Sequence, residues 1–356
     1  MLPGCYVTSQ DVLERGETVT ITMAELAKKC GFSKATVSRA LADDPRVKPE
    51  TKTYIKGMAK KYNYEPHVVA SNLARRRTKT IGLMFPKAPR TIADPFFLEY
   101  LHGVSETLFE HGYSLLIPQV KQARVTDTIG QITTHNRVDG IILTEPKIED
   151  ERITLLQERE VPFVFLGSTV CENVSWVDGD NISGAYEAVR ALVKLGHEEI
   201  AIITGEEGLV STRNRFAGYE KAMEDFNLPI NPDWIWEGDF TREGGFRAVR
   251  QQLEEHGSIQ VTAIFASNDL MAIGVIQALK EAGYEIPQDI SVIGFDGIEV
   301  GQYLSPPLTT VQQPIYQLGQ QVSQVLVEQI ENGGEPVQIK LPVQVVNATN
   351  TIGRPS

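Results

Sequence analysis

The chain has 356 residues, a formal net charge of −12 at pH 7, and 42% hydrophobic and 22% charged residues. This length exceeds one ordinary hydrophobic core, so two or three globular domains are expected. No run of eighteen apolar residues occurs, which argues against a transmembrane helix. The three cysteines, Cys5, Cys30 and Cys171, lack metal-ligand spacing and fit reduced thiols in a cytoplasmic protein.

Residues 1–19 show no clear hydrophobic period. They also lack the basic stretch and the long apolar core of a secretory signal. We therefore expect residues 1–19 to be a disordered arm, or the product of an upstream start site, rather than a functional segment.

Residues 20–66 have the pattern of a helix-turn-helix domain. Thr22 is a plausible N-cap, with Glu25 as its capping-box partner, and Gly31 suits the turn after the first helix. Ser33 then caps a second helix from Lys34 to Leu41. Pro49 opens a third helix to about Tyr62. The residues expected to face the small core are Leu26, Ala27, Cys30, Val37, Ala40, Leu41, Tyr54, Ile55, Met58 and Ala59.

The second helix presents small or hydrogen-bonding side chains on its outer face, as a helix that enters the major groove of DNA would. Residues 20–80 contain fourteen Lys or Arg and five Asp or Glu, a net charge of +9. Since residues 1–19 contribute −2, residues 81–356 carry −19. A basic head on an acidic body is typical of a protein that binds nucleic acid with one end. The alternative, a lysine-rich helical cap on an enzyme, does not explain why capping, turn, spacing and charge agree.

After Pro66, the segment HVVASNLAR has an apolar face that nothing in its own chain covers, and a helix this short is not stable alone in water. Arg75, Arg76 and Arg77 follow it, either as phosphate contacts or as a solvated linker.

These residues resemble the DNA-binding domain of the LacI/GalR family of bacterial repressors. The matching residues are Met23 to Ala27, Gly31 to Ser33, Ala35 to Arg39, Val47, Tyr64, Pro66 and Ala70 to Ala74. The resemblance implies a homodimer, or a tetramer, on a palindromic double-stranded operator. It makes residues 67–79 a hinge helix and linker, with Leu73 wedged into a minor-groove step. The DNA-contacting residues are then Thr22, Ser33, Lys34, Ala35, Thr36, Ser38, Arg39, Asn72, Leu73 and Ala74.

From Thr80 onward, short apolar runs alternate with amphipathic helices. The strand-like runs are IGLMF, YSLLI, GIILT and PFVFL, then AIIT, TAIFA and SVIGF. The expected helices are 96–110, 123–136, 149–159, 182–195, 212–226, 242–255 and 268–282. A further strand and helix follow, and then two strands up to Thr351. Strands buried on both faces, each followed by a helix, predict parallel sheets.

The predicted fold is therefore a small all-α helix-turn-helix head, residues 20–66, plus an α/β body, residues 80–356. The body comprises two interleaved, doubly wound parallel-sheet subdomains that bind the effector and dimerise. It resembles the periplasmic sugar-binding proteins, whose ligands lie between the subdomains. GxGxxG after the first strand, the P-loop, GxSxG and HExxH are all absent, so we expect no enzyme, no cofactor and no metal site.

Residues at predicted strand ends are the candidates for the ligand site, since open α/β sheets hold ligands there. The family's Ser-x-x-x-Arg signature assigns Arg215, and Asp296 is the best acceptor for hydroxyl groups. Asp269 is either a ligand contact or the cap of the helix that begins there. Arg215 and Asp296 either bind the ligand or pair with each other in a structural salt link. The candidate residues are Asp94, Phe96, Phe97, Thr144, Ser168, Arg215, Phe240, Asn268, Asp269 and Asp296.

Two departures from the family pattern affect ligand specificity. Gly167 and Ser168 stand where many relatives have an Asp, or an Arg one residue later, and Asn347 stands where they usually have Arg. We expect a sugar or related polyol as effector. A nucleobase or phosphoprotein co-repressor is the alternative for a regulator of this kind. A sugar-binding receptor of the transport type is the other alternative, but such a receptor has no need of residues 20–77.

Overall fold

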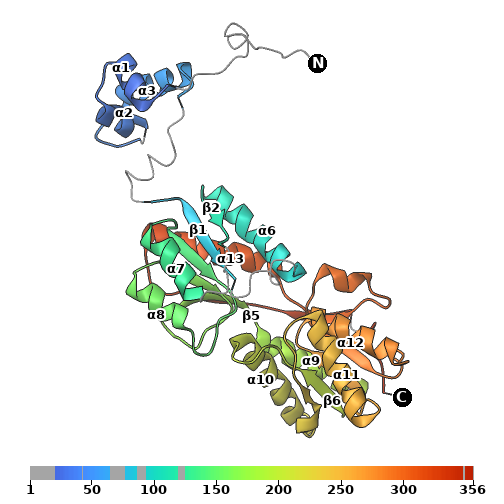
Figure 1. The fold of residues 1–356 in the computed structure, drawn as a ribbon. Coiled ribbons are helices and arrows are strands. Elements are labelled where there is room, and N and C mark those ends of the chain that lie inside the picture. Colours follow the sequence, from blue (N-terminus) through green and yellow to red (C-terminus); the bar gives the residue numbers. More distant parts are fainter. Residues whose placement is uncertain are drawn as a thin grey trace, which may run out of the picture. The chain divides into compact units, whose positions relative to one another are not determined.

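The computed structural model describes residues 21–41, 43–64, 77–85, 94–118, 125–347 and 349–355. The chain divides into two compact units between Thr78 and Lys79, here called the head and the body (Figure 1). The expectations for residues 1–19 and for Asn72, Leu73 and Ala74 lie outside the described residues.

The head contains three short helices. They are α1 (Met23–Cys30), α2 (Lys34–Leu41) and α3 (Pro49–Lys61). The predicted capping box is confirmed: the Thr22 amide donates to Glu25 Oε2 at 2.8 Å, and the Glu25 amide donates to Thr22 Oγ1 at 3.3 Å. Gly31 follows α1 with φ +71°, a conformation that glycine adopts without steric cost. The first turn therefore forms as its sequence predicts.

The core of the head is formed by side chains from all three helices, with Leu26, Val37 and Ile55 fully buried. The prediction that Tyr54 faces this core is wrong, because its side chain is 49% exposed. The inner stripe of α3 consists of residues four apart, Ile55 and Ala59. Tyr54 instead packs its ring edge-on against Phe32 at the rim, with ring centroids 6.3 Å apart.

The body contains two six-stranded sheets, as the alternating pattern predicts. The first sheet has the order β11-β5-β4-β3-β1-β2, and all its pairs are parallel. The second has the order β12-β10-β9-β8-β6-β7 and is parallel except for the antiparallel pair of β10 and β12. The strands of the first sheet are β1 (Thr80–Met84), β2 (Ser114–Leu116), β3 (Gly140–Leu143), β4 (Phe163–Leu166), β5 (Ser175–Gly179) and β11 (Gln338–Leu341). Those of the second are β6 (Ile200–Ile203), β7 (Ile235–Trp236), β8 (Ala263–Ala266), β9 (Ser291–Asp296), β10 (Thr309–Gln312) and β12 (Gln344–Val346).

The body helices lie close to their predicted ranges. They are α6 (Pro95–Glu110), α7 (Val125–Thr134), α8 (Glu151–Glu158), α9 (Asn181–Leu195), α10 (Val210–Asp225), α11 (Arg242–His256), α12 (Asp269–Glu281) and α13 (Ile315–Asn332), with the 3-10 turns η1 (Pro232–Trp234) and η2 (Glu299–Tyr303). Two strands, β5 and β7, were not predicted, because neither is a continuous apolar run.

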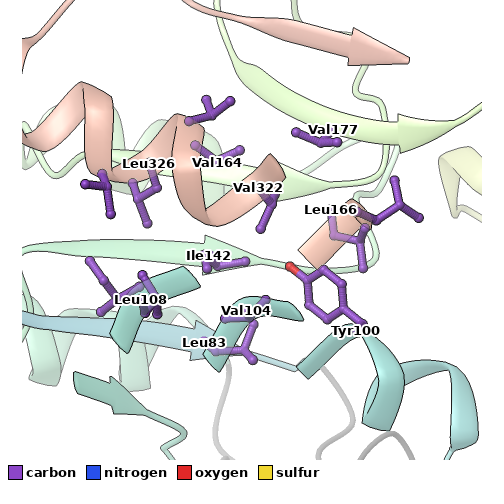
Figure 2. Close-up of a cluster of buried hydrophobic side chains, with 14 of the residues drawn as sticks. Leu83, Tyr100, Val104, Leu108, Ile142, Val164, Leu166, Val177, Val322 and Leu326 are labelled. Carbon is purple, nitrogen blue, oxygen red and sulfur yellow. The ribbon is translucent and has the colours of Figure 1, made fainter. Parts of the chain in front are cut away.

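The chain passes between the two sheets after β5, after β10 and after β11. The return after β10 brings α13 onto the first sheet, where Val322 and Leu326 pack with Tyr100 and Val104 of α6 in one core (Figure 2). The backbones of α6 and α13 meet closely, since a Cβ at Gly319 would lie 2.3 Å from the Tyr100 carbonyl oxygen. The subdomains are therefore interleaved.

None of the helices in the described part of the chain combines the length and hydrophobicity needed to span a bilayer.

Candidate functional site

The outer face of α2 carries the residues expected to read DNA. Lys34, Ala35 and Arg39 are exposed, and Thr36 and Ser38 are half-buried. Ser33 precedes the helix, and its Oγ accepts a hydrogen bond from the Thr36 amide at 3.1 Å. The side chains of Thr22 and Ser33 therefore cap helices. The side chains of Lys34 and Arg39 have no hydrogen-bond or ion-pair partner among the described residues.

A cavity lies in the body where the carboxyl ends of strands from both sheets meet. β4 and β5 of the first sheet and β9 of the second end at its wall. The lining residues are Asp94, Phe96, Phe97, Glu145, Pro146, Leu166, Gly167, Asp178, Asn181, Leu209, Ser211, Arg215, Phe240, Asn268, Asp296, Gln313 and Leu318. Strand ends of this kind are where open α/β sheets bind ligands.

Arg215 is the only basic residue in the described lining, and it is buried. Its Nε donates to Asn181 Oδ1 at 2.7 Å, its Nη1 to the Ser267 carbonyl, and its Nη2 to Asp296 Oδ1 at 3.3 Å. The guanidinium also lies over the Phe295 ring, 3.9 Å from the centroid. Burial lowers the pKa of Arg215, and the neighbouring carboxylates oppose that shift. These contacts hold the guanidinium in one orientation.

The acidic residues of the cavity outnumber this one cation. Burial raises the pKa of Asp296 to about 6, although Arg215 and the Gln313 amide, 2.8 Å away, act to lower it. Burial and the Asp296 charge raise the pKa of Asp94 to about 7. Burial also raises the pKa of Asp178, whose carboxylate accepts from the Ser168 amide at 2.9 Å. In the described lining, acidic side chains therefore outnumber basic ones.

Several polar atoms at the cavity retain hydrogen-bonding capacity. Asp94 uses Oδ1 to accept from the Phe96 amide at 3.0 Å, as the N-cap of α6. Asp296 uses Oδ1 for Arg215 and Gln313. Within the described ranges, Oδ2 of each aspartate and Oε1 of Gln313 have no hydrogen-bond partner. When the two carboxyl groups are ionised, all three atoms accept hydrogen bonds, so they match a ligand that donates them.

Three cavity residues other than glycine have a positive φ: +117° at Asp296, +61° at Phe240 and +52° at Glu145. Side-chain-bearing residues rarely adopt such angles, and they tend to gather at functional sites. Three of the ten described non-glycine residues with positive φ therefore line the cavity.

Seven of the ten ligand-site candidates from the sequence line the cavity: Asp94, Phe96, Phe97, Arg215, Phe240, Asn268 and Asp296. The other three lie beside it with their polar atoms engaged elsewhere. Thr144 is fully buried and donates to the Met84 carbonyl at 3.2 Å, and Ser168 Oγ accepts from Asn214 at 3.1 Å.

Asp269 is also fully buried, and its carboxylate accepts from the amides of Gly297 and Ile298, both at 2.8 Å. The alternative prediction that Asp269 caps α12 is wrong, because Asn268 is the cap and accepts from the Met271 amide at 2.9 Å. Asp269 instead fixes the turn after β9, next to Asp296.

The two departures from the family pattern lie in different places. Gly167 lines the cavity with φ +105°, and a Cβ there would come within 2.8 Å of the Pro146 ring. Asn347 does not line the cavity, and its side chain donates to Gln302 at 2.9 Å and to the Leu308 carbonyl at 3.1 Å.

Sequence reasoning missed Asp178, Asn181 and Gln313 in the lining. Asp178 lies on β5, the unpredicted strand, and Asn181 begins the next helix. The run SWVDGDN, a short strand followed by acidic and amide residues at a helix start, is the signal that could have found both. Gln313 lies on a crossover after β10, where no simple pattern marks it.

Comparison with known proteins covers both units. Residues 22–67 match the family "Bacterial regulatory proteins, lacI family", and residues 78–349 match "Periplasmic binding proteins and sugar binding domain of LacI family". The HTH-type transcriptional repressor PurR of Haemophilus influenzae (strain PittEE) is 34% identical over 320 residues, which cover 89% of this chain and 93% of the relative.

Two solved structures are similar over nearly the whole chain. One is a complex of the transcriptional regulator CelR with cellobiose, with a TM-score of 0.73 and 29% identity, covering 94% of this chain and 100% of that one. The other is the lac repressor dimer bound to operator and the anti-inducer ONPF, with a TM-score of 0.80 and 27% identity, covering 94% of this chain and 99% of that one. The chain therefore belongs to the LacI family of bacterial regulatory proteins and is a DNA-binding transcriptional regulator rather than an enzyme.

Proposed function

We propose that this regulator is a cytoplasmic repressor that binds a palindromic operator as a homodimer. A neutral, hydroxyl-rich molecule, a sugar or related polyol, controls it from the cavity of the body. The observation that supports this ligand class is a set of acceptor atoms in one cavity that have no hydrogen-bond partner among the described residues: Oδ2 of Asp94, Oδ2 of Asp296 and Oε1 of Gln313.

Operator binding is assigned to the head. The exposed side chains of Lys34 and Arg39 can reach base edges or phosphates, and a bidentate contact from Arg to guanine is a frequent specific contact. Ala35, Thr36 and Ser38 lie on the same helix, and Thr22 and Ser33 at the helix starts. Asn72, Leu73 and Ala74 remain proposed hinge contacts. The operator-bound dimer of the lac repressor supports this arrangement.

The ligand class follows from hydrogen-bond matching. Each hydroxyl group of a polyol can donate to an aspartate oxygen, and it can also accept from the N–H groups of Arg215 that remain unused. Phe96, Phe97 and Phe240 offer apolar surface to the C–H face of a sugar ring. The CelR complex with cellobiose shows that a relative of this fold takes a sugar.

The charge of the cavity argues against anionic ligands. In the described lining, the carboxyl groups of Asp94, Asp178 and Asp296 outnumber the single guanidinium of Arg215. A phosphate or carboxylate brought into this partly buried site would meet like charges at short range, which disfavours its ionised form. We therefore expect sugar phosphates to bind more weakly than the parent sugars.

The test is a thermal-melting screen of the full chain against neutral sugars and polyols, sugar phosphates, and purine bases. A ligand that binds only the folded state at 100 times its Kd stabilises the protein by about 2.7 kcal/mol, a readily measured shift. We expect neutral polyols alone to raise the melting temperature, and the shift to disappear in Asp296→Asn. A shift produced by phosphates or by bases, with none from neutral polyols, would reject the proposed ligand class.

A further inference from the structure

A short backbone pairing joins the two walls of the cavity. Residues 144–150 follow β3 of the first sheet, and residues 208–210 follow β6 of the second. Lys147 and Leu209 form an isolated antiparallel bridge. The Ile148 amide donates to the Gly208 carbonyl at 3.0 Å, and the Val210 amide donates to the Pro146 carbonyl at 3.0 Å. This pairing is called the cross-wall bridge.

The cross-wall bridge borders the cavity on both sides. Pro146 on one strand of the bridge and Leu209 on the other both line it. Val210 is the first residue of α10, the helix that carries Ser211 and Arg215 into the lining. Formation of the bridge therefore sets the distance between the loop after β3 and the helix that supplies the cavity's only described cation.

Arg152 stabilises residues 144–150, the loop that forms one strand of the cross-wall bridge. Arg152 does not line the cavity itself. Its side chain is buried and donates from Nη1 to the Thr144 carbonyl at 3.0 Å and from Nη2 to the Glu145 carbonyl at 2.9 Å. The guanidinium also makes a two-pronged ion pair with Asp150, at 2.7 Å from Nε and 2.6 Å from Nη2. One planar side chain thus fixes both ends of the segment Thr144 to Asp150.

Contacts at Glu145 and Pro146 stabilise this conformation of the 144–150 loop. Glu145 has φ +52°, which costs energy for a residue with a side chain, and the bond from Arg152 to its carbonyl stabilises that conformation. The Pro146 ring occupies the space beside Gly167 that any larger residue at 167 would need. Arg152 and Gly167 together place Pro146 at the cavity wall.

We infer that Arg152 is a positioning residue for the ligand cavity: it presents the 144–150 loop so that the loop pairs with residues 208–210 and draws the two walls together. Its importance for the effector rests on the proposed function. The bridge itself is testable without any ligand, so its failure is distinguishable from failure of the ligand screen.

The bridge can be broken at one hydrogen bond. Val210→Pro removes the N–H that donates to Pro146, and proline is favourable at the first position of a helix. Leu209, which precedes it, has φ −82° and ψ 140°, a conformation compatible with a following proline. Val210→Ala is the matched control, since it also loses the valine side chain but keeps the N–H.

The readout is hydrogen exchange of the Ile148 amide in the full chain. The two hydrogen bonds flank the same residue pair, Lys147 and Leu209. Loss of one bond therefore weakens the other. A net hydrogen bond of about 0.5–1.5 kcal/mol corresponds to exchange about 2- to 12-fold faster in Val210→Pro than in Val210→Ala. Equal exchange in the two variants, or no protection of Ile148 in the unmodified protein, would overturn the bridge.

Arg152→Lys tests the positioning role, because lysine keeps the charge but cannot make the planar fork. We expect faster exchange of the Ile148 and Val210 amides, while Phe265 in the middle of β8 keeps its rate. Acceleration of Phe265 by the same factor would show that Arg152 only stabilises the fold. If Arg152→Lys does not fold, the Val210 pair of variants still decides whether the bridge exists.

Discussion

The head and the body arrange their functional groups in opposite ways. In the head, stability and recognition lie on different faces of the same helices: Val37 and Ala40 of α2 are buried, whereas Lys34 and Arg39 are exposed. In the body, the cavity groups are buried and hydrogen-bonded to one another across segments far apart in the chain, as Arg215 is to Asn181 and Asp296. Substitutions on the exposed face of α2 should therefore change recognition alone, whereas truncation of a buried cavity residue should change both stability and ligand binding.

The largest expected effect is in the body. Arg215→Ala leaves Asp296 buried without its counter-charge, and breaking a buried pair this way costs about 3–5 kcal/mol. We expect a lower melting temperature for the ligand-free body together with loss of the polyol-induced shift, both measured by scanning calorimetry. Arg213→Ala, on the exposed side of the same helix, is the control and should change neither. A full ligand shift in Arg215→Ala would show that the pair is structural only.

Leu26→Ala should have the next largest effect, in the head. Leu26 is completely buried, and such truncations cost about 2–5 kcal/mol, a loss that a three-helix core of this size can hardly tolerate. The head should lose its fold and operator binding while the body keeps its melting transition and its ligand shift. Circular dichroism at increasing temperature follows both units. Lys28→Ala on the exposed face of α1 should leave both transitions in place, and an equal drop in the body transition of Leu26→Ala would contradict the independence of the units.

Arg39→Ala should affect recognition without affecting stability. Loss of a bidentate contact to guanine costs about 1–3 kcal/mol of discrimination between operator and random DNA. Fluorescence anisotropy with both duplexes measures the ratio of the two Kd values, and the melting temperature should be unchanged. An equal loss of affinity for both duplexes would make Arg39 a phosphate contact instead.

The last expected effect is a change in the pH dependence of body stability. The folded-state pKa of Asp94 is raised to about 7, above its unfolded value of about 3.9, so the protonated carboxyl is favoured in the folded protein. Its stabilising contribution is complete below about pH 4 and is lost as the pH rises through 7. Asp296 and Glu145 are the acidic groups that face it.

Asp94→Asn removes that titration while keeping a good N-cap for α6. We expect its melting temperature to fall less between pH 5 and pH 8 than that of the unmodified protein. Parallel curves for the two proteins would mean that Asp94 is not desolvated in solution.

The head was predictable because its signals are local. The Thr22–Glu25 capping box and the turn at Gly31 lie within ten residues, and the structure has both. Tyr54 was misplaced because helical spacing alone does not tell a core position from its neighbour on the rim, where Phe32 offers a second aromatic ring.

The cavity was predictable only in part, because its groups come from both sheets. The family's Ser-x-x-x-Arg signature found Arg215, and strand-end reasoning found Asp296. The same reasoning also selected Asp269, whose buried carboxylate accepts hydrogen bonds from two backbone amides. The turn after β9 places those amides, and sequence spacing does not predict that turn. Asp178 was missed because β5 is polar at its end, and Gln313 because a crossover brings it back beside Asp296.

The central claim is that a polyol at the Asp296 cavity controls operator binding by the head, and a reciprocal binding measurement tests it most directly. An operator duplex is first selected from random DNA, and a polyol is taken from the melting screen. The Kd for operator is then measured with and without polyol, and the Kd for polyol with and without operator. Thermodynamic linkage predicts that both change by the same factor, different from one, and that Asp296→Asn abolishes the effect of polyol while leaving operator binding intact. A polyol that binds the cavity but leaves the operator Kd unchanged would contradict the account.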